Sequence, residues 1–428
     1  MGQAEKYIRA GLYRNYMSKI KEVLACEILN AKGLPTIEAT VVLSDGKIGV
    51  ASCPSGELIG NYEALDLKDH DEKRFEGQGV LRAVANIKNI IAPAIVGKEA
   101  EHQQEVDKIM IDLDGTQNKS RLGANAILSV SMAVAKAGAQ SSVLPLFLYL
   151  RQFVKKDHDL LKIPVPIFNL IRSPDFHEFL IVPASSKPYT ESIQIGEAIY
   201  KSLKKILEVK TSGELGDYEE GFAPNLSTNK EAFTFLQQAA EDAQIKIGFD
   251  VFLGLDSRAS LFFKDGKYRI KDIPTSLSAQ ELINYYEELN KDVHLLYLED
   301  ALNEDDWEGW RFLFEKLSAT TIIAGGDLIA TNPYRLQMAL DKKAINGIVI
   351  KPNQVGTVIE SLAIAEAAKE TGLKIIVSHR SNETNDDFMA DFAVAVAADY
   401  IKIGSLARGE NIAKYNRLLQ IENQLKIL

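Results

Sequence analysis

The sequence has very little cysteine and no long apolar segment. Its 428 residues include two cysteines, Cys26 and Cys53, which excludes a disulfide framework and favours a reducing compartment. No apolar run approaches the length that a membrane-crossing helix needs, and no stretch has the pattern of a signal peptide. We therefore expect a cytoplasmic protein without a membrane span.

Positive charge is also in short supply. The chain has 49 Lys and Arg against 59 Asp and Glu, a net charge of -10, which argues against nucleic acid and anionic membranes as partners. An anionic small ligand would have to be held by a local cluster of cations. With 46% hydrophobic and 25% charged residues, the chain is otherwise typical of a globular protein with a large core.

The chain divides into three predicted parts. Residues 1–16 form an N-terminal arm, residues 17–154 form a small α+β domain, and residues 155–428 form a second domain after a polar boundary at 155–159. In the first domain we expect a hairpin with an Asp-Gly turn, followed by helices with apolar residues at helical spacing. The corresponding stretches are a strand at 36–43, the turn at 44–47, and helices at 80–91 and 124–137.

Eight short apolar runs recur in the second domain, and helical stretches separate the last six. This is the pattern of a (β/α)₈ barrel. Only residues 170–177 separate the first two runs, which is too short for a right-handed crossover and predicts an antiparallel hairpin, followed by two helices in succession. The eight runs are 165–169, 178–182, 247–252, 295–299, 321–325, 347–351, 374–378 and 400–403.

Polar side chains are predicted to collect at the carboxyl-terminal rim of this barrel, where such barrels carry their active sites. Ser378, His379, Arg380 and Ser381 follow one predicted strand. A helix predicted to begin at Glu383 would add free N–H groups, which favour a phosphate or a carboxylate. A capping network without a ligand is the alternative.

Two lysines, Lys351 and Lys402, take matching positions at the ends of neighbouring predicted strands. A lysine at a barrel rim can act as a general base where burial and a nearby cation, such as Arg380, favour its neutral form. The alternative is two ordinary lysines that bury only their stems, although their matched positions disfavour it.

Acidic residues are predicted to reach the same rim and to bind a metal ion. Asp250 and Glu299 belong to the third and fourth predicted strands, and Glu178 begins the reversed second strand. Glu219 lies in the segment between the two successive helices. Mg²⁺ binds a few carboxylates on rigid supports and leaves its other positions to water and substrate. A cap or an ion-pair partner is the alternative for Asp250.

Several specific motifs support one resemblance. They are NKSRLGANA at 118–126, GFAPNL at 221–226, LED at 298–300 with DDW at 305–307, KPNQVGT at 351–357, and SHRS at 378–381 with ET at 383–384. These motifs resemble the enolase family over nearly the whole chain from about Lys21. The resemblance implies an enolase-type modified (β/α)₈ barrel with an N-terminal α+β capping domain, and Mg²⁺-dependent dehydration of 2-phosphoglycerate to phosphoenolpyruvate, a step of glycolysis. It also implies a homo-oligomer, specifically a dimer.

The resemblance further implies a role for each rim residue. Lys351 is the expected base that removes the proton beside the carboxylate, and Glu219 is the acid that assists departure of the hydroxyl. Arg380 and Ser381 are expected to hold the phosphate of a small phosphorylated carboxylate. The other expected contacts are His177, Glu178, His379 and Lys402 with the substrate, and Asp250 and Glu299 with Mg²⁺.

The sequence departs from the family pattern at the metal site and in two loops. Gly326 replaces the first Asp of the family's Gly-Asp-Asp-Leu, and Asp327 could serve instead only through a bulge, because adjacent strand residues face opposite sides. Leu58 stands where the family's mobile loop has a serine ligand for a second metal. The loop at 170–177 is short and lacks the family's substrate-facing histidine, and Cys26 replaces an arginine of the dimer contact.

Two functional hypotheses follow. The first is an enolase with weakened Mg²⁺ binding and impaired turnover. The second is a catalytically retired paralogue that keeps the fold as a binding or scaffold protein. Retention of Lys351 and Glu219 favours activity, whereas the changes at Gly326 and Leu58 favour retirement. Another acid-sugar dehydratase or a racemase on this barrel is disfavoured, because the phosphate motif at 378–381 is intact.

Overall fold

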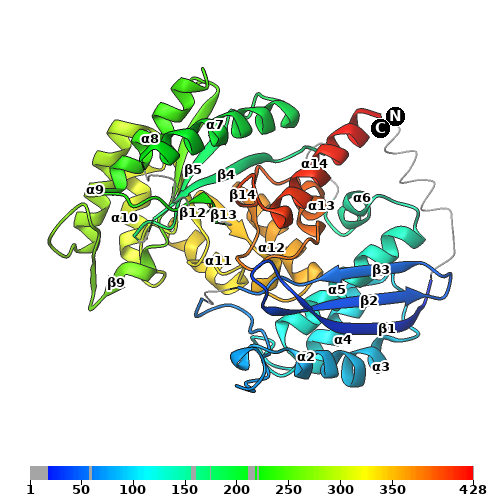
Figure 1. Cartoon of the computed structure of the whole chain (residues 1–428). Helices are drawn as coiled ribbons and strands as arrows, with labels where there is room; N and C mark the ends of the chain where they lie inside the picture. Colours follow the sequence, from blue (N-terminus) through cyan, green and yellow to red (C-terminus); the bar gives the residue numbers. More distant parts are fainter. Residues whose placement is uncertain are drawn as a thin grey trace.

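The computed structural model describes residues 18–56, 60–155, 161–173, 175–210, 217–218 and 221–427. Figure 1 shows a small domain with a three-stranded sheet beside a larger barrel. Predictions about residues 1–16, Leu58 and Glu219, and most of the boundary at 155–159, fall outside the described residues. Among the helices that the structure describes, none combines the length and the apolar character that crossing a membrane requires.

The sheet of the first domain is antiparallel and confirms the predicted hairpin. It consists of β1 (Ile20–Leu29), β2 (Pro35–Leu43) and β3 (Ile48–Ser52), in that order. Gly46 has a φ of 83° in the turn between β2 and β3, a conformation that favours glycine. The helices are α2 (Leu81–Asn86), η2 (Ile87–Ile91), α3 (Ala92–Ile95), α4 (Gln103–Asp114), α5 (Ala124–Ser141) and α6 (Leu146–Arg151), with the short η1 (Phe75–Gly77) before them.

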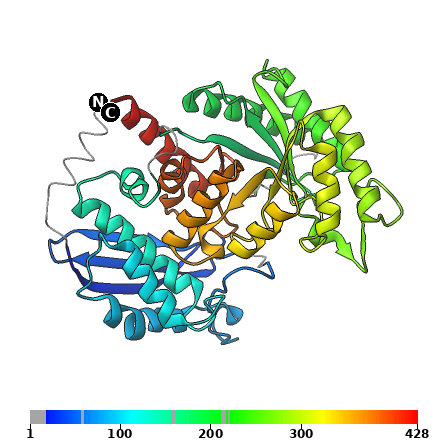
Figure 2. The same ribbon diagram turned by 180° about the vertical axis from the view of Figure 1, so that it is seen from behind.

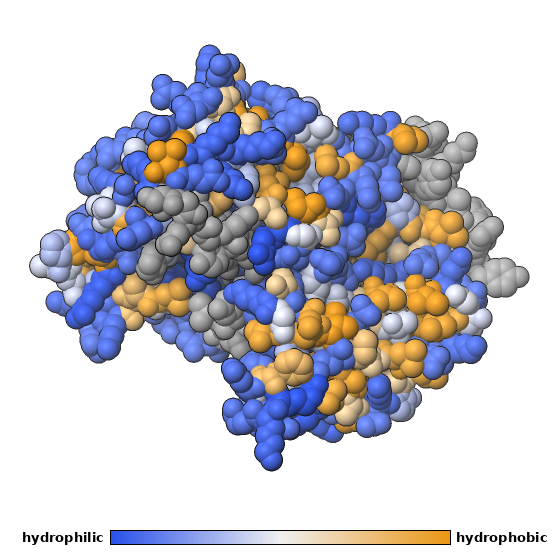
Figure 3. Space-filling view, viewed as in Figure 1, coloured by the Kyte–Doolittle hydropathy of each residue, from blue (hydrophilic) through white to orange (hydrophobic). Residues whose placement is uncertain are grey.

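One face of this sheet packs against α5 and the other carries exposed apolar side chains. A Cβ on Gly49 would lie 2.0 Å from the backbone oxygen of Ala133, so only glycine lets β3 and α5 approach so closely. Leu24, Ile48 and Val50 are each more than two-fifths exposed. Hydrophobic surface is visible over this side of the molecule in Figure 3.

Eight strands close the barrel, as predicted. β4 and β5 form the expected antiparallel hairpin, β5 pairs antiparallel with β8, the following pairs are parallel, and β15 returns to β4. The strands are β4 (Val165–Arg172), β5 (Glu178–Pro183), β8 (Val251–Asp256), β11 (Leu295–Glu299), β12 (Ile322–Gly325), β13 (Gly347–Ile350), β14 (Lys374–Ser378) and β15 (Tyr400–Lys402).

The barrel helices surround these strands, as Figure 2 shows from behind. Two helices in succession follow the hairpin, which confirms that prediction. The helices are α7 (Tyr189–Lys210), α8 (Asn229–Asp242), α9 (Ala279–Val293), α10 (Trp307–Leu317), α11 (Pro333–Asp341), α12 (Val358–Glu370), α13 (Phe388–Ala395) and α14 (Gly409–Ile427). Shorter elements are β6 (Asp217–Tyr218), β7 (Gly221–Phe222), η3 (Ala259–Phe262), β9 (Phe263–Lys264), β10 (Lys267–Tyr268) and η4 (Pro352–Gln354).

Side chains from alternate positions of the strands fill the barrel below its rim. This inner cluster is separate from the larger core between strands and helices. The barrel is therefore a packed support, and ligands have access only to its rim. The inner cluster consists of Ile167, Leu180, Val182, Tyr297, Ile322, Ala324, Val349 and Ile376.

Two element boundaries differ from the predictions, and both differences change the site. The third barrel strand covers 251–256 rather than 247–252, so Asp250 precedes it and Asp256 ends it. The helix expected from Glu383 begins at Phe388 instead, after a stretch in which Asn382 has a φ of 63°. Between Glu383 and Phe388, the side chains of Thr384 and Asp386 accept hydrogen bonds from the backbone N–H groups of Asp386 and Phe388, and such local bonds compete with a helix.

Candidate active site

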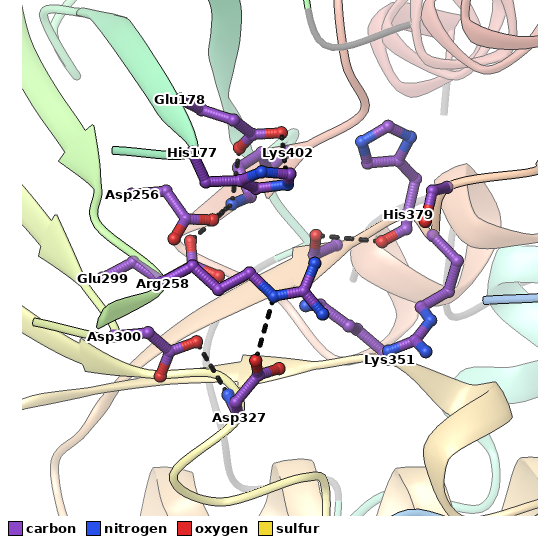
Figure 4. A pocket seen from close by; sticks show the side chains of 13 residues that line it. His177, Glu178, Asp256, Arg258, Glu299, Asp300, Asp327, Lys351, His379 and Lys402 are labelled. Atoms are coloured by element: carbon purple, nitrogen blue, oxygen red, sulfur yellow. Dashed lines mark hydrogen bonds and ion pairs between the residues drawn. The ribbon is translucent and has the colours of Figure 1, made fainter. Parts of the chain in front are cut away.

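A pocket opens at the carboxyl-terminal ends of the barrel strands (Figure 4). It brings together most of the residues that the sequence singled out, from strands that are far apart in the chain. Its described lining is His177, Glu178, Asp256, Arg258, Glu299, Asp300, Asp327, Lys351, Ser378, His379, Arg380, Ser381 and Lys402.

Lys402 lies at the centre of the acidic side of this pocket. Its Nζ is 3.0 Å from Glu178 Oε2, 2.7 Å from Asp256 Oδ2 and 2.6 Å from Glu299 Oε2. All four side chains are buried. Burial alone would lower the pKa of Lys402, but the three carboxylates hold it well above its ordinary value. The ammonium is therefore charged and bound to the protein's own carboxylates.

Asp256 takes the position that was predicted for Asp250. It ends β8 and pairs in register with Glu178 on one side and Glu299 on the other. Asp250 lies at the opposite end of β8, where its Oδ1 is 3.2 Å from Lys187 Nζ. A backbone N–H bond from Lys246 and the nearby Lys187 lower the pKa of Asp250. The prediction that Asp250 is a rim ligand was therefore wrong.

The error has a simple physical cause. The stretch IGFDVFLGLD at 247–256 is apolar almost throughout and carries an aspartate in its middle and another at its end. Hydrophobic pattern alone does not say which aspartate terminates the strand. If the last residue of the apolar run is taken as the strand end, Asp256 is the residue expected at the rim.

Asp300 supports the turn that follows β12. Its carboxylate accepts hydrogen bonds from the backbone N–H groups of Gly326 at 2.9 Å, Asp327 at 2.7 Å and Leu328 at 3.4 Å. Burial raises the pKa of Asp300 well above its ordinary value, and the neighbouring charges of Asp327 and Glu299 raise it further. Asp300 belongs to the LED motif at 298–300, but the sequence alone gave it no role in the site.

Arg258 brings a second cation to the acidic side. Its Nε is 3.1 Å from Asp327 Oδ2, and both side chains are largely buried. Burial would raise the pKa of Asp327, but the charges of Arg258, Lys351 and Arg380 outweigh it and lower the pKa to about 2. Asp327 therefore faces the pocket as an ionised carboxylate paired with a guanidinium. Arg258 was missed from the sequence, because it follows the strand that was misplaced.

The acidic residues fit a Mg²⁺ ion only incompletely. Oxygens of Asp256, Glu299 and Asp300 lie within 4.8 Å of one another, and Asp256 Oδ1 and Glu299 Oε1 accept no hydrogen bond within the described residues. These two oxygens could face a cation. Their partner oxygens are bound to Lys402, however, and Glu299 Oε2 also accepts a bond from Tyr297 at 2.6 Å.

The remaining positions of such a site are occupied. A Cβ on Gly326 would lie 2.5 Å from Asp300 Oδ2 and 2.9 Å from Glu299 Oε1, so the present arrangement has no space for a further carboxylate there. Asp327, which the sequence allowed as a substitute only through a bulge, is paired with Arg258. The donor set therefore does not fit a fully coordinated Mg²⁺ ion, which requires near-octahedral oxygen ligands.

The basic side of the pocket is formed by the ends of β13 and β14. Lys351 directly follows β13, and His379 follows β14, so both lie where the sequence predicted them. Burial lowers the pKa of His379 well below its ordinary value, and the charges of Lys414 and Lys402 lower it further. His379 is therefore neutral. His177 lines the same pocket, with its Nε2 3.8 Å from Glu178 Oε1.

Arg380 is held by a carboxylate from the first domain. Its Nη2 is 2.8 Å from Glu63 Oε2 and its Nη1 donates to Glu63 Oε1 at 3.0 Å, a two-point contact between buried groups. Its backbone N–H donates to Glu383 Oε1 at 3.0 Å, and Glu383 also pairs with Lys414 at 3.1 Å. The predicted helix start beside Arg380 was wrong, because α13 begins only at Phe388, and the chain's own Glu383 accepts from the Arg380 N–H group.

Family comparison covers nearly all of the chain. The C-terminal TIM barrel domain of enolase matches residues 161–427. The N-terminal domain of enolase matches residues 20–150. The two matches follow one another in the order of the two structural parts described above, and the pocket lies in the matched barrel. The chain therefore belongs to the enolase family.

Proposed function

We propose that the pocket is an enolase-like lyase site that binds a small phosphorylated carboxylate, 2-phosphoglycerate or phosphoenolpyruvate, and that its dehydration reaction is strongly impaired. The observation that carries this proposal is the state of Lys402. The pocket gathers Lys351, His379, Arg380 and Ser381 around one space, yet the Lys402 ammonium that should face the substrate is bound to three carboxylates.

The proposed reaction removes water from 2-phosphoglycerate. Lys351 would take the proton from the carbon beside the carboxylate, and the hydroxyl on the next carbon would leave with a proton from Glu219. A proton beside a carboxylate is hardly acidic, so the extra negative charge must be stabilised by cations that are already in place. His379 is neutral and can donate one hydrogen bond and accept another, but it adds no charge.

Two features support impairment. We propose that Mg²⁺ binds more weakly than in an ordinary enolase, because Asp256 and Glu299 would be its main ligands and both already bind Lys402. When bound, the ion would supply positive charge near the substrate carboxylate. In addition, Arg380 must leave Glu63 before its fork can contact a phosphate. Buried charge pairs open at a considerable cost in free energy.

A catalytically retired paralogue with a binding or scaffold role is the second candidate. The same pairing favours it, because a pocket whose charges are satisfied internally is stable without substrate. We also propose a homodimer in the cytoplasm. The exposed apolar face of the first domain supports the homodimer. The free cysteines Cys26 and Cys53 support a reducing compartment.

An assay for phosphoenolpyruvate formation from 2-phosphoglycerate at saturating Mg²⁺ separates the candidates. We expect a rate at least about 10²-fold below that of an ordinary enolase, because the loss of one preorganised electrostatic group lowers a rate by about this factor. Lys351→Ala is the matched control and should abolish any residual rate. A rate equal to that of an ordinary enolase would overturn impairment, and a residual rate that survives Lys351→Ala would reassign the base.

A further inference from the structure

Arg258 has an unusual backbone conformation as well as unusual side-chain partners. It lies two residues beyond the end of β8 with φ 45° and ψ 49°, a left-handed conformation that non-glycine residues adopt at a cost. The backbone is held there by neighbouring bonds: Ser257 N–H donates to the backbone oxygen of Glu299 at 2.9 Å, and Ala259 N–H to the backbone oxygen of Asp300 at 2.9 Å. The turn thus fixes the origin of the Arg258 side chain beside the acidic residues.

The side chain extends into the pocket. Figure 4 shows it between Asp256 on one side and Asp327 on the other. Burial works against its charge, but Asp327, Asp256 and Asp300 raise the pKa of Arg258 above its already high value. A guanidinium is charged at every ordinary pH and is less strongly hydrated than an ammonium, so it is suited to a buried site. Arg258 is therefore a permanent cation of this pocket.

Arg258 and Lys402 together pair with four of the carboxylates on the acidic side. Lys402 contacts Glu178, Asp256 and Glu299, and Arg258 pairs with Asp327. Both cations are covalently part of the barrel, so their positive charge is present before any ligand arrives. Gly326, next to Asp327, has no side-chain carboxylate, so no further cation is needed to neutralise a charge at that position.

We propose that Arg258 and Lys402 take the place of a divalent cation in this pocket, so that a phosphorylated carboxylate binds without one. The nature of the ligand rests on the proposed function, whereas the replacement of the ion by side chains does not. The fixed positive charge of the Arg258 guanidinium, beside Asp327, can attract the carboxylate of the ligand, which a metal ion would otherwise coordinate. Divalent cations then compete with Lys402 for Asp256 and Glu299, and with Arg258 for Asp327, instead of assisting the ligand.

Ligand binding is measured by calorimetry with phosphoenolpyruvate, once in EDTA and once in excess Mg²⁺. For the unmodified protein we expect the same dissociation constant in both. Arg258→Met should weaken binding in EDTA by about tenfold, since a hydrogen bond to a charged group contributes on this scale. Arg258→Lys should retain part of the affinity. Arg269→Met, which removes an exposed arginine on the same segment, should change nothing.

A second measurement needs no organic ligand. Mn²⁺ titration, followed by the paramagnetic signal of the free ion, should show weak binding to the unmodified protein and about tenfold tighter binding to Arg258→Met, because removing the guanidinium leaves Asp327 free to coordinate. Circular dichroism establishes that the variants are folded. If Arg258→Met does not fold, the comparison is made with Arg258→Lys. With lysine retained as a cation, Mn²⁺ binding should stay weak.

The outcomes separate the two proposals. Phosphoenolpyruvate binding that requires Mg²⁺, or Mn²⁺ binding to the unmodified protein as tight as to Arg258→Met, would overturn the replacement of the ion by Arg258. Absence of phosphoenolpyruvate and 2-phosphoglycerate binding in both buffers would instead overturn the proposed ligand, and the Mn²⁺ titration would still decide the role of Arg258.

Discussion

The acidic and the basic side of the pocket differ in where their counter-charges come from. On the acidic side, Lys402 and Arg258 both belong to the barrel itself and lie among carboxylates from neighbouring strands. On the basic side, the partner of Arg380 is Glu63, which belongs to the first domain. A movement of that domain segment can release Arg380. Release of the acidic side requires the barrel rim itself to rearrange.

This contrast suggests how the two sides respond to ligands. An anion can reach the basic side by displacing Glu63, whose other bonds are also to groups near the domain boundary, including Gly60 and Gln354. A metal ion can reach the acidic side only by displacing buried ammonium and guanidinium groups. We therefore expect the basic side to be adaptable and the acidic side to be fixed.

The largest effect is expected from removing the cation of the acidic side. Lys402→Met leaves three buried carboxylates without their common partner and should lower the free energy of unfolding by about 3–5 kcal/mol. Urea denaturation measures this. Lys374→Met is the matched control, because Lys374 pairs with Asp399 at an exposed position on β14 and should contribute roughly 0–1 kcal/mol. Equal effects of both substitutions would show that Lys402 does not hold the acidic side together.

The next effect concerns restoring a metal ligand. Gly326→Asp alone should not create a tight Mg²⁺ site, because its side chain would meet Asp300 and Glu299 while Arg258 still pairs with Asp327. Combined with Arg258→Ala, it should tighten Mn²⁺ binding by roughly ten- to a hundredfold, the usual scale for such groups. Calorimetry of the single and double variants provides the comparison. If Gly326→Asp alone gave the full gain, Arg258 would not be the obstacle.

A smaller effect is expected on the basic side. Glu63→Gln removes the charge that holds Arg380 and should tighten binding of phosphate or phosphoenolpyruvate by about tenfold, the contribution of a released charge-assisted hydrogen bond. Glu360→Gln is the matched control, since Glu360 pairs with Lys119 outside the pocket. Calorimetric titration measures both. Unchanged affinity in Glu63→Gln would mean that Arg380 does not contact the ligand.

The smallest effect is a pH dependence of stability. The pKa of Asp327 is lowered from 3.8 to about 2, so its pair with Arg258 stabilises the fold fully above pH 3.8 and loses that effect as pH falls toward about 2. Asp327→Asn should therefore make the free energy of unfolding less dependent on pH in this window. Asp300, whose pKa is raised, contributes with the opposite sign and loses its effect as pH rises.

Urea denaturation at several pH values measures this slope. Asp250→Asn is the control, because Asp250 has a lowered pKa but pairs with Lys187 in a solvent-accessible position, where water weakens the interaction. A slope that is the same in Asp327→Asn and in the unmodified protein would contradict the pairing with Arg258.

Much of the fold could be predicted, because apolar periodicity and connection length are local properties of the sequence. The short link at 170–177 was sufficient to predict the antiparallel β4–β5 hairpin. The end of β8 could not be located, because its apolar run has an aspartate at two positions. Because of that ambiguity, Asp250 was predicted at the rim, and both Asp256 and Arg258 were missed.

The charge pairs were beyond prediction for another reason. Arg258 and Asp327 are 69 residues apart, and Arg380 and Glu63 are 317 apart, so the tertiary fold chooses these partners. The sequence identified Arg380 and Lys402 as cations of the site but could not show that protein carboxylates bind them. The helix expected from Glu383 also begins later, because the side chains of Thr384 and Asp386 accept hydrogen bonds from the backbone N–H groups there.

We propose that side chains, rather than a divalent ion, neutralise the acidic side of the pocket. The most direct test is a crystal of the unmodified protein grown with millimolar Mn²⁺ and phosphoenolpyruvate, analysed by anomalous scattering of manganese. We predict the ligand beside Arg380 and Ser381, the Arg258–Asp327 pair intact, and no manganese peak between Asp256 and Glu299. A strong peak coordinated by those two carboxylates, with Lys402 displaced, would contradict the account.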